Sequence, residues 1–285
     1  MHLTSKRLSV EVATMEGNPS TRFEHLPYVS SVLLDSRHSF LSAEKTKAGD
    51  GTRGVGLMHG FLNSSEMDDD NTSGFYPVIG TGIAKIPADG YSIRINYPCD
   101  FAEVNLISSN PASASFRLYQ NPFCGISYEI IRTFALTDDS LHISTKMTNL
   151  GERILAAKQY CHNFFLFDGI PNDSSYQVNM MDCRDLQVVR GSVILGKEWY
   201  RPYEFDERLG TMALTYSPGD EDDEVLKISN MITKTSVEIE NHFQVLERYH
   251  WHSPWCICPE SFVKIRLESG QSIDFSRTYR FLTHP

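Results

Sequence analysis

A histidine lies among aromatic residues in the segment QYCHNFFLFDG, which covers residues 159–169. Because side chains alternate along a β-strand, His162 would share one face with Tyr160 and Phe164, while Asn163 would lie on the other face. A titratable imidazole in so apolar a strand either has a buried hydrogen-bond partner or faces a cavity. The segment therefore predicts either a core histidine or one available for acid-base chemistry, and it does not by itself decide between them.

A second group of polar residues lies near the C-terminus, in the segment YHWHSPWCICPESF at residues 249–262. It combines two histidines, two tryptophans and one glutamate. Glu260 follows Pro259 in an otherwise apolar run, which disfavours a role as an ordinary surface charge. A further histidine, His59, lies near the end of the glycine-rich stretch at residues 48–60, whose spacing does not match a phosphate-binding loop.

Two histidines one residue apart, His250 and His252, would lie on one face of a strand, as in the metal sites of cupin-type proteins. Such a site would continue with a carboxylate a few residues later, but residues 254–257 offer none. The six cysteines include no CxxC pair, which disfavours a structural zinc site. The sequence therefore predicts no bound metal and no cofactor.

The elements that would carry these residues are β-strands. From residue 74 onward, short segments of alternating apolar and polar residues are separated by turn residues, as in β-sandwich proteins. Turns at residues 137–140 and 149–152 would join three strands, the last of which contains His162. Neither a long amphipathic helix nor a linker is indicated. We therefore predict an all-β fold in one domain over residues 1–285, with two large antiparallel sheets packed face to face and a concave face that forms a cleft.

The composition narrows the range of partners. The chain has 285 residues, and its 26 basic residues face 36 acidic ones, which gives a net charge of −10. Without a dense Lys/Arg block, nucleic acid and anionic membranes are poor partners, and a small polar ligand is favoured. No apolar run reaches the length of a transmembrane helix, and the widely spread cysteines indicate a reduced, cytoplasmic protein. The sequence does not decide whether the protein forms a homodimer.

Three segments, in this order, are similar to the galactose mutarotase-like family, which includes aldose 1-epimerases and hexose-6-phosphate mutarotases. LMHG at residues 57–60 resembles the family's early Leu-His-Gly segment, and residues 137–169 resemble its strand pair ending in Asn-His-x-Tyr-Phe-Asn-Leu. Residues 256–281 resemble its closing Cys-x-Glu-Pro segment and final strand. The match in order extends from about Phe23 to the end of the chain. It implies the family's fold, an antiparallel β supersandwich.

The sequence departs from the family's pattern in three places. No asparagine directly precedes His162, Pro259 stands before Glu260 rather than after it, and the early Asn-Arg signature of true galactose mutarotases is not evident. Arg37 and Arg53 are the candidates for that arginine. Because a fold does not fix a function, these departures bear on the reaction more than on the fold.

The resemblance implies acid-base catalysis at a sugar ring, which would interconvert sugar anomers. His162 would be the general acid and Glu260 the general base, with Glu247 as the second candidate for the base. His59 would hold a sugar hydroxyl. The further candidates for substrate binding are Arg53, Asn163, His250, His252, Trp251 and Trp255. The tryptophans could stack on the apolar face of a sugar or simply pack in the core.

Two other functions would use the same cleft. A non-catalytic carbohydrate-binding module would need the cleft and its aromatic side chains, but not the acid-base pair. A lyase or isomerase acting on a uronate or a specialised metabolite would use His162 and Glu260 for proton abstraction. The sequence alone does not separate these functions from sugar epimerisation.

Overall fold

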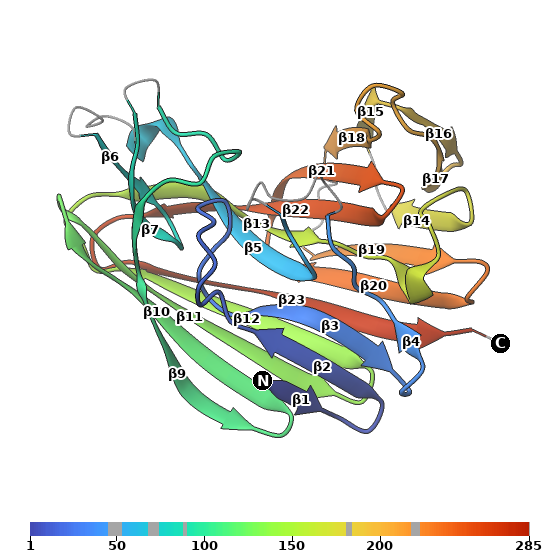
Figure 1. Ribbon diagram of the computed structural model, residues 1–285, viewed down its shortest axis with the longest axis horizontal. Coiled ribbons are helices and arrows are strands. Elements are labelled where there is room, and N and C mark those ends of the chain that lie inside the picture. The colour runs from blue at the N-terminus through green and yellow to red at the C-terminus, as the bar shows by residue number, and fades with distance from the viewer. Residues whose placement is uncertain (45–52, 68–73, 88–89, 181–183, 218–222, 285) are drawn as a thin grey trace.

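The computed structural model describes residues 1–44, 53–67, 74–87, 90–180, 184–217 and 223–284, and antiparallel β-strands dominate them. They form two ten-stranded sheets, which we call the site sheet and the back sheet, and one three-stranded small sheet (Figure 1). The described residues also include two short 3-10 helices, η1 (Ser65–Met67) and η3 (Phe167–Gly169). Residues 48–52 of the glycine-rich stretch lie outside the described residues.

The strand order determines which segments meet. In spatial order, the site sheet contains β1 (His2–Thr4), β2 (Leu8–Ala13), β3 (Tyr28–Leu34), β5 (Leu57–Asn63), β13 (Leu155–Asn163), β22 (Cys256–Leu267), β21 (Val245–Ser253), β18 (Met212–Ser217) and β15 (Arg184–Arg190), with β4 (His38–Ser39) paired to β3. The back sheet contains β16 (Ser192–Leu195), β17 (Trp199–Glu204), β14 (Tyr176–Met180), β19 (Asp223–Asn230), β20 (Thr235–His242), β23 (Ser272–Thr283), β12 (Ser140–Asn149), β11 (Ile126–Thr137), β10 (Ser113–Phe123) and β9 (Glu103–Asn110). The small sheet contains β6 (Phe75–Val78), β7 (Gly82–Lys85) and β8 (Cys99–Phe101). The last two strands in the sequence, β22 and β23, therefore lie in the interiors of the two large sheets.

The burial pattern distinguishes the strand that carries the central histidine. In β10, Ala114, Phe116 and Leu118 are buried, and the residues between them are partly exposed. Such period-2 burial is expected of a strand with one face on the core. In β13, by contrast, every residue except Lys158 is buried. Both faces of β13 are therefore covered, one by the back sheet and the other by the side chains of a cleft.

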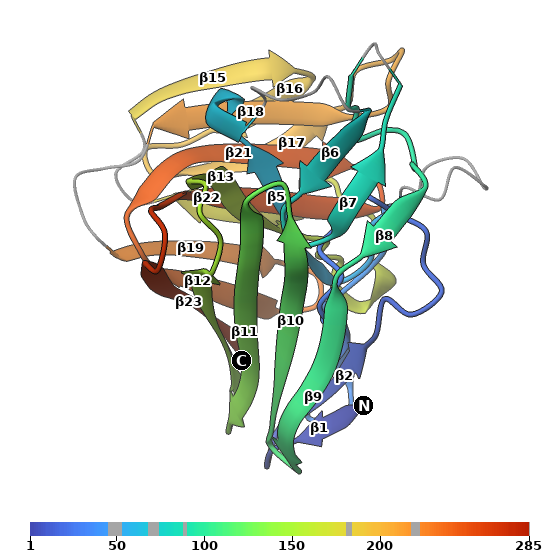
Figure 2. The ribbon, with the colours of Figure 1, turned by 90° about the vertical axis from the view of Figure 1, so that its left-hand side faces the viewer.

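Buried polar contacts join the two large sheets. In Figures 1 and 2, β13 and β22 lie over β12 and β23. Arg277 of β23 donates a hydrogen bond to Oε1 of Gln159 on β13 over 3.0 Å. Arg132 of β11 forms an ion pair with Glu24, in the segment before β3, over 2.7 Å, and both side chains are 1% exposed. Because buried polar groups are nearly always hydrogen-bonded, these contacts favour one arrangement of the back sheet against β13 and the segment before β3.

The structure confirms the all-β prediction, with two large sheets packed face to face. The two predicted turns are also present. One lies between the end of β11 at Thr137 and the start of β12 at Ser140, and the other lies between the end of β12 at Asn149 and the start of β13 at Leu155. No helix in the described part of the chain is long and apolar enough to cross a membrane.

Candidate functional site

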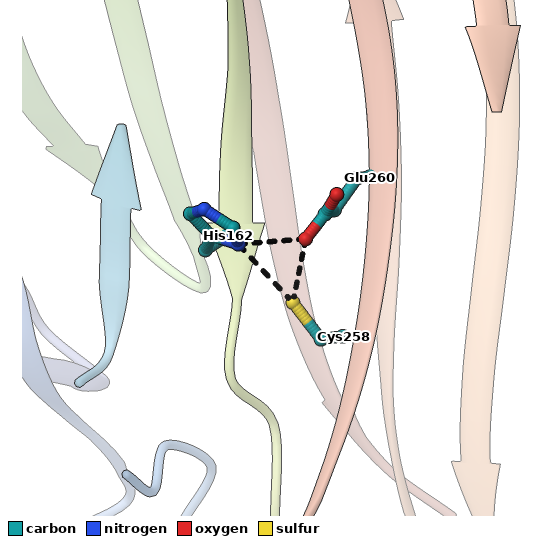
Figure 3. Close-up of side chains that lie close together, drawn as sticks. All are labelled: His162, Cys258 and Glu260. Atoms are coloured by element: carbon teal, nitrogen blue, oxygen red, sulfur yellow. Dashed lines mark hydrogen bonds and ion pairs between the residues drawn. The ribbon is translucent and has the colours of Figure 1, made fainter. Parts of the chain in front are cut away.

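His162 and Glu260 are side-chain neighbours across two adjacent strands. The antiparallel register of β13 and β22 runs from Leu155 opposite Leu267 to Gln159 opposite Val263. The same register, extended by three residues, brings His162 opposite Glu260. Nδ1 of His162 lies 2.6 Å from Oε1 of Glu260, and both residues are buried (Figure 3). Strand pairing therefore brings together two residues that are far apart in the sequence.

The second ring nitrogen of His162 also has a partner. Nε2 lies 3.1 Å from the hydroxyl of Tyr160, two residues earlier on the same face of β13. The Phe164 ring lies parallel to the imidazole at 5.5 Å, and Phe23 contacts it edge-on at 5.3 Å. Burial, and then the Glu260 carboxylate, raise the pKa of Tyr160, so it remains a neutral phenol at physiological pH. The imidazole is therefore held in one orientation by hydrogen bonds and aromatic rings.

Cys258 completes a cluster with the histidine and the glutamate. Its thiol donates to Oε1 of Glu260 over 3.4 Å, and Sγ lies 3.9 Å from Nδ1 of His162. Because side chains two residues apart share a strand face, Cys258 and Glu260 both point toward His162 (Figure 3). Burial and the Glu260 carboxylate raise the pKa of the Cys258 thiol well above its usual value, which keeps it protonated.

A cleft of about 670 Å³ opens beside this cluster, with His162 and Glu260 in its wall. Its aromatic lining consists of Tyr160, Phe164, Tyr249, Trp251 and Phe262. Its other charged side chains are Arg22, Arg94, Arg190, Arg248, Glu44 and Glu247. The volume is that of a small-molecule site, and the mixture of aromatic and hydrogen-bonding groups suits a polar ligand with an apolar face.

Ion pairs and hydrogen bonds hold several of the charged groups in place. Arg22 pairs with Glu44 over 2.7 Å, and Arg190 donates to the hydroxyl of Tyr249 over 3.0 Å. Glu247, the second candidate for the base, pairs with Lys158 over 2.8 Å and has a side chain that is 44% exposed. A carboxylate at the rim with a lysine partner is less suited to act with His162 than the buried Glu260.

Two of the candidate binding residues face the interior between the sheets. His59 pairs with Cys161 in the β5–β13 register, and its Nδ1 lies 2.9 Å from the amide nitrogen of Gln159. Burial, and then the charge on Arg132, lower the pKa of His59 well below its usual value. Asn163 donates to the carbonyl oxygen of Pro259 over 2.5 Å and accepts from the Tyr279 hydroxyl over 2.9 Å. Asn163 thus fastens β13 to β22 beside the His162–Glu260 pair, and neither residue lines the cleft.

The histidine pair of β21 also faces away from the cleft. The hydroxyl of Tyr200 lies 2.8 Å from Nδ1 of His250 and 2.8 Å from Nε2 of His252, and the hydroxyl of Tyr216 lies 3.1 Å from Nε2 of His250. Trp251, between the two histidines, points the other way and lines the cleft. Within the described ranges, neither histidine belongs to a group of three metal-ligating side chains. The pair therefore serves the packing of β21 against β17 and β18.

We expect the free energy of unfolding to fall as the pH is lowered from about 6.5 toward 3. Burial lowers the pKa of His252 to about 3 and that of His250 well below its usual value. The unfolded chain takes up protons near the ordinary histidine pKa of about 6.5, so it binds more protons than the folded chain in this window. The contribution of these two buried histidines to the free energy of unfolding is therefore fully present above about pH 6.5, and it is lost as the pH falls.

Denaturant titrations at several pH values measure this slope. His252→Gln should reduce the slope by about one proton. The matched control is His284→Gln, because His284 is exposed at the C-terminal end. A stability that stays constant between pH 7.5 and 5 would contradict the prediction.

The remaining sequence candidates lie outside the cleft lining. Trp255 is 41% exposed at the turn between β21 and β22. Arg37 is exposed at the turn between β3 and β4, and Arg53 is half-buried outside the set of cleft residues. Of the candidate tryptophans, Trp251 alone lines the cleft.

Sequence reasoning assigned no role to several residues in the cleft lining and in the cluster beside it. The alternation of β13 had already placed Tyr160 and Phe164 on the face of His162, and the spacing in β22 would have placed Cys258 beside Glu260. Arg22 and Arg94 lie in irregular segments, where a single sequence carries no periodic signal. Their positions depend on how distant segments pack, which the sequence pattern does not indicate.

No protein-family model matches the sequence, and no curated protein matches it either. Solved structures do match the fold. A galactose mutarotase related enzyme from Lactobacillus acidophilus is 12% identical, and the match covers 99% of this chain and 97% of that chain with a TM-score of 0.62. A galactose mutarotase-like protein from Lactobacillus casei is 12% identical, with 99% of each chain covered and a TM-score of 0.60.

A third match is a GalM/aldose epimerase homologue from C. elegans, which is 12% identical, with 100% of this chain and 99% of that chain covered and a TM-score of 0.52. At this level of identity, the likeness concerns the fold and not the reaction. The predicted β supersandwich is confirmed: this chain has the galactose mutarotase-like fold over nearly its whole length.

Proposed function

We propose that the chain is an aldose 1-epimerase-like isomerase, which interconverts the anomers of a sugar by acid-base catalysis. The observation that carries the proposal is the 2.6 Å contact between His162 Nδ1 and Glu260 Oε1 in the wall of the cleft. Opening a cyclic hemiacetal requires a base for the anomeric hydroxyl and an acid for the ring oxygen. A carboxylate and an imidazolium side by side supply these two groups.

The contacts of the pair suggest a role for each atom. Glu260 uses Oε1 for both His162 and Cys258, so we assign Oε2 to the anomeric hydroxyl. The same carboxylate fixes the imidazole through Nδ1 and directs Nε2 toward Tyr160. A sugar bound in the cleft would replace the Tyr160 hydroxyl as the partner of Nε2, and Nε2–H would then deliver the proton to the ring oxygen.

The rest of the cleft supports a sugar as the ligand. Trp251 offers an aromatic face to the C–H groups of a sugar ring, and the Arg22–Glu44 pair offers hydrogen bonds to its hydroxyls. The proposed location is the cytoplasm, because the cysteines that the structure describes with their side chains are free thiols. Several solved structures of this fold carry mutarotase-like names, which supports the same reaction class by analogy.

A panel of free hexoses, pentoses, uronates and sugar phosphates tests the proposal. We expect the purified chain to speed the equilibration of at least one freshly dissolved anomer by more than about 100-fold over buffer, as general acid-base catalysis allows. Polarimetry and proton NMR exchange measure the rate, with heat-inactivated protein as the control. If no sugar on the panel equilibrates faster, the proposal fails. If sugars bind without faster equilibration, the chain is a carbohydrate-binding module.

A further inference from the structure

Three potential metal ligands meet at the cleft wall. Nδ1 of His162, Sγ of Cys258 and the carboxylate of Glu260 all lie within 4.8 Å of one another, and each side chain is buried. Figure 3 shows the three groups pointing at one common space, His162 from the end of β13 and the other two from β22. The sequence-based prediction of no bound metal rested on the His250–His252 pair and on the absence of a CxxC pair, and it did not connect Cys258 with His162.

The two edges of this triangle that involve sulfur are close to those of a zinc site. Zinc–ligand distances of about 2.0–2.2 Å to nitrogen and oxygen and about 2.3 Å to sulfur place the donor atoms of a tetrahedral site about 3.3–3.6 Å apart. Here the sulfur lies 3.4 Å from Glu260 Oε1 and 3.9 Å from His162 Nδ1. The remaining distance, 2.6 Å between His162 and Glu260, is that of a hydrogen bond. It would have to widen by about 0.7 Å when a metal replaces the shared proton.

The chemistry of the ligands also fits zinc. Imidazole, thiolate and carboxylate are its nitrogen, sulfur and oxygen ligands, and three protein ligands with one open position are typical of accessible zinc sites. His162 and Glu260 line the cleft, so the fourth position would face the space that a ligand enters. The other nitrogen of His162 is held by Tyr160 over 3.1 Å, and such an outer contact fixes the ring of a metal-bound histidine.

We propose that His162, Cys258 and Glu260 form a zinc site whose occupancy excludes the acid-base state of the same residues. Binding releases the Cys258 thiol proton and the proton shared by His162 and Glu260 to solvent, and the metal takes the freed lone pairs. A bound ion thus occupies both the acid and the base. Inhibition of sugar turnover by zinc rests on the proposed function, whereas binding of the metal does not.

Cobalt(II) is the spectroscopic probe, because tetrahedral cobalt with a thiolate ligand has intense visible bands and a sulfur-to-metal charge-transfer band in the near ultraviolet. Cobalt added to the chelator-treated chain should give both features at one equivalent, and zinc should bleach them. Cys258→Ser should abolish the charge-transfer band. Glu260→Gln should weaken zinc binding by about 100-fold or more, since changes outside the ligand set already cost 10–100-fold.

The matched control is Cys256→Ser, because Cys256 is a buried thiol two residues earlier on the same strand face. It should keep the cobalt bands, and thermal unfolding checks that each variant is folded. Absence of the bands in the wild type, or survival of the charge-transfer band in Cys258→Ser, would overturn the zinc site. If cobalt binds as expected and no sugar is converted, the metal site stands and the isomerase proposal fails. If cobalt binds as expected and sugars are converted at an unchanged rate in saturating zinc, the claim that the ion excludes the acid-base state fails.

Discussion

Glu260→Gln is expected to lower the rate of anomer interconversion by about 10²–10⁴-fold while the chain keeps its fold and its affinity for the sugar. Glutamine has nearly the same shape as glutamate, but its amide does not accept the anomeric proton. Oε1 of Glu260 also holds Nδ1 of His162 at 2.6 Å, so the exchange weakens the orientation of the acid as well. The loss should therefore appear in kcat more than in KM, as measured by NMR exchange at several sugar concentrations.

Glu247→Gln is the matched control for this variant. Both carboxylates line the cleft, but Glu247 is half-exposed and paired with Lys158. Its loss should change the rate by only a few-fold, because a rim ion pair contributes about 0–1 kcal/mol. If Glu247→Gln were inactive and Glu260→Gln fully active, the base would be Glu247 and the assignment made here would be wrong.

Arg132→Met is expected to lower the free energy of unfolding by about 3–5 kcal/mol. Arg132 and Glu24 lie 2.7 Å apart with side chains that are 1% exposed, so the change leaves a carboxylate buried without its counter-charge. Burial already raises the pKa of Glu24, and Arg132 opposes that shift. Equilibrium unfolding in denaturant at neutral pH measures the loss.

A double variant separates the charge from the packing. Arg132→Met combined with Glu24→Leu should recover much of the loss, because no unpaired charge then remains in the interior. Arg266→Met is the surface control, since Arg266 pairs with Glu66 and Glu268 on an exposed face, and it should cost less than about 1 kcal/mol. A single variant at Arg132 that costs no more than Arg266→Met would show that the buried pair is not a strong contributor.

The sequence predicts features that depend on local alternation of apolar and polar residues. It does not predict contacts between residues of different strands, because these depend on the strand register. Period-2 patterns indicated the strands, and alternation correctly separated the face of His162 from that of Asn163 in β13. The contact between His162 and Glu260 was expected from the family resemblance alone, because the register of β13 and β22 depends on pairing across about a hundred residues. His59 shows the same difficulty. The residue type suggested a role in the cleft, but His59 is paired in register with Cys161, which faces the interior.

The single-domain prediction and the assignment of catalytic roles remain predictions. The aromatic residues around His162 could be inferred from β13 itself, whereas the Tyr200 hydroxyl between His250 and His252 comes from the opposite sheet. A local pattern shows that a histidine is buried, but not which distant phenol satisfies it. Hydrogen-bond partners of this kind depend on how the two sheets stack, and the pattern of one segment does not predict that stacking.

The central positions of β22 and β23 have a consequence for how the chain folds as it leaves the ribosome. Until residues 256–283 have emerged, β13 and β21 lack the strand between them in one sheet, and β12 and β20 lack theirs in the other. Nascent chains of this protein would therefore carry open strand edges that can pair with other chains, which makes them candidates for chaperone binding. Glu260 arrives on β22, the strand between β13 and β21, so the contact between His162 and Glu260 forms only after this strand has emerged.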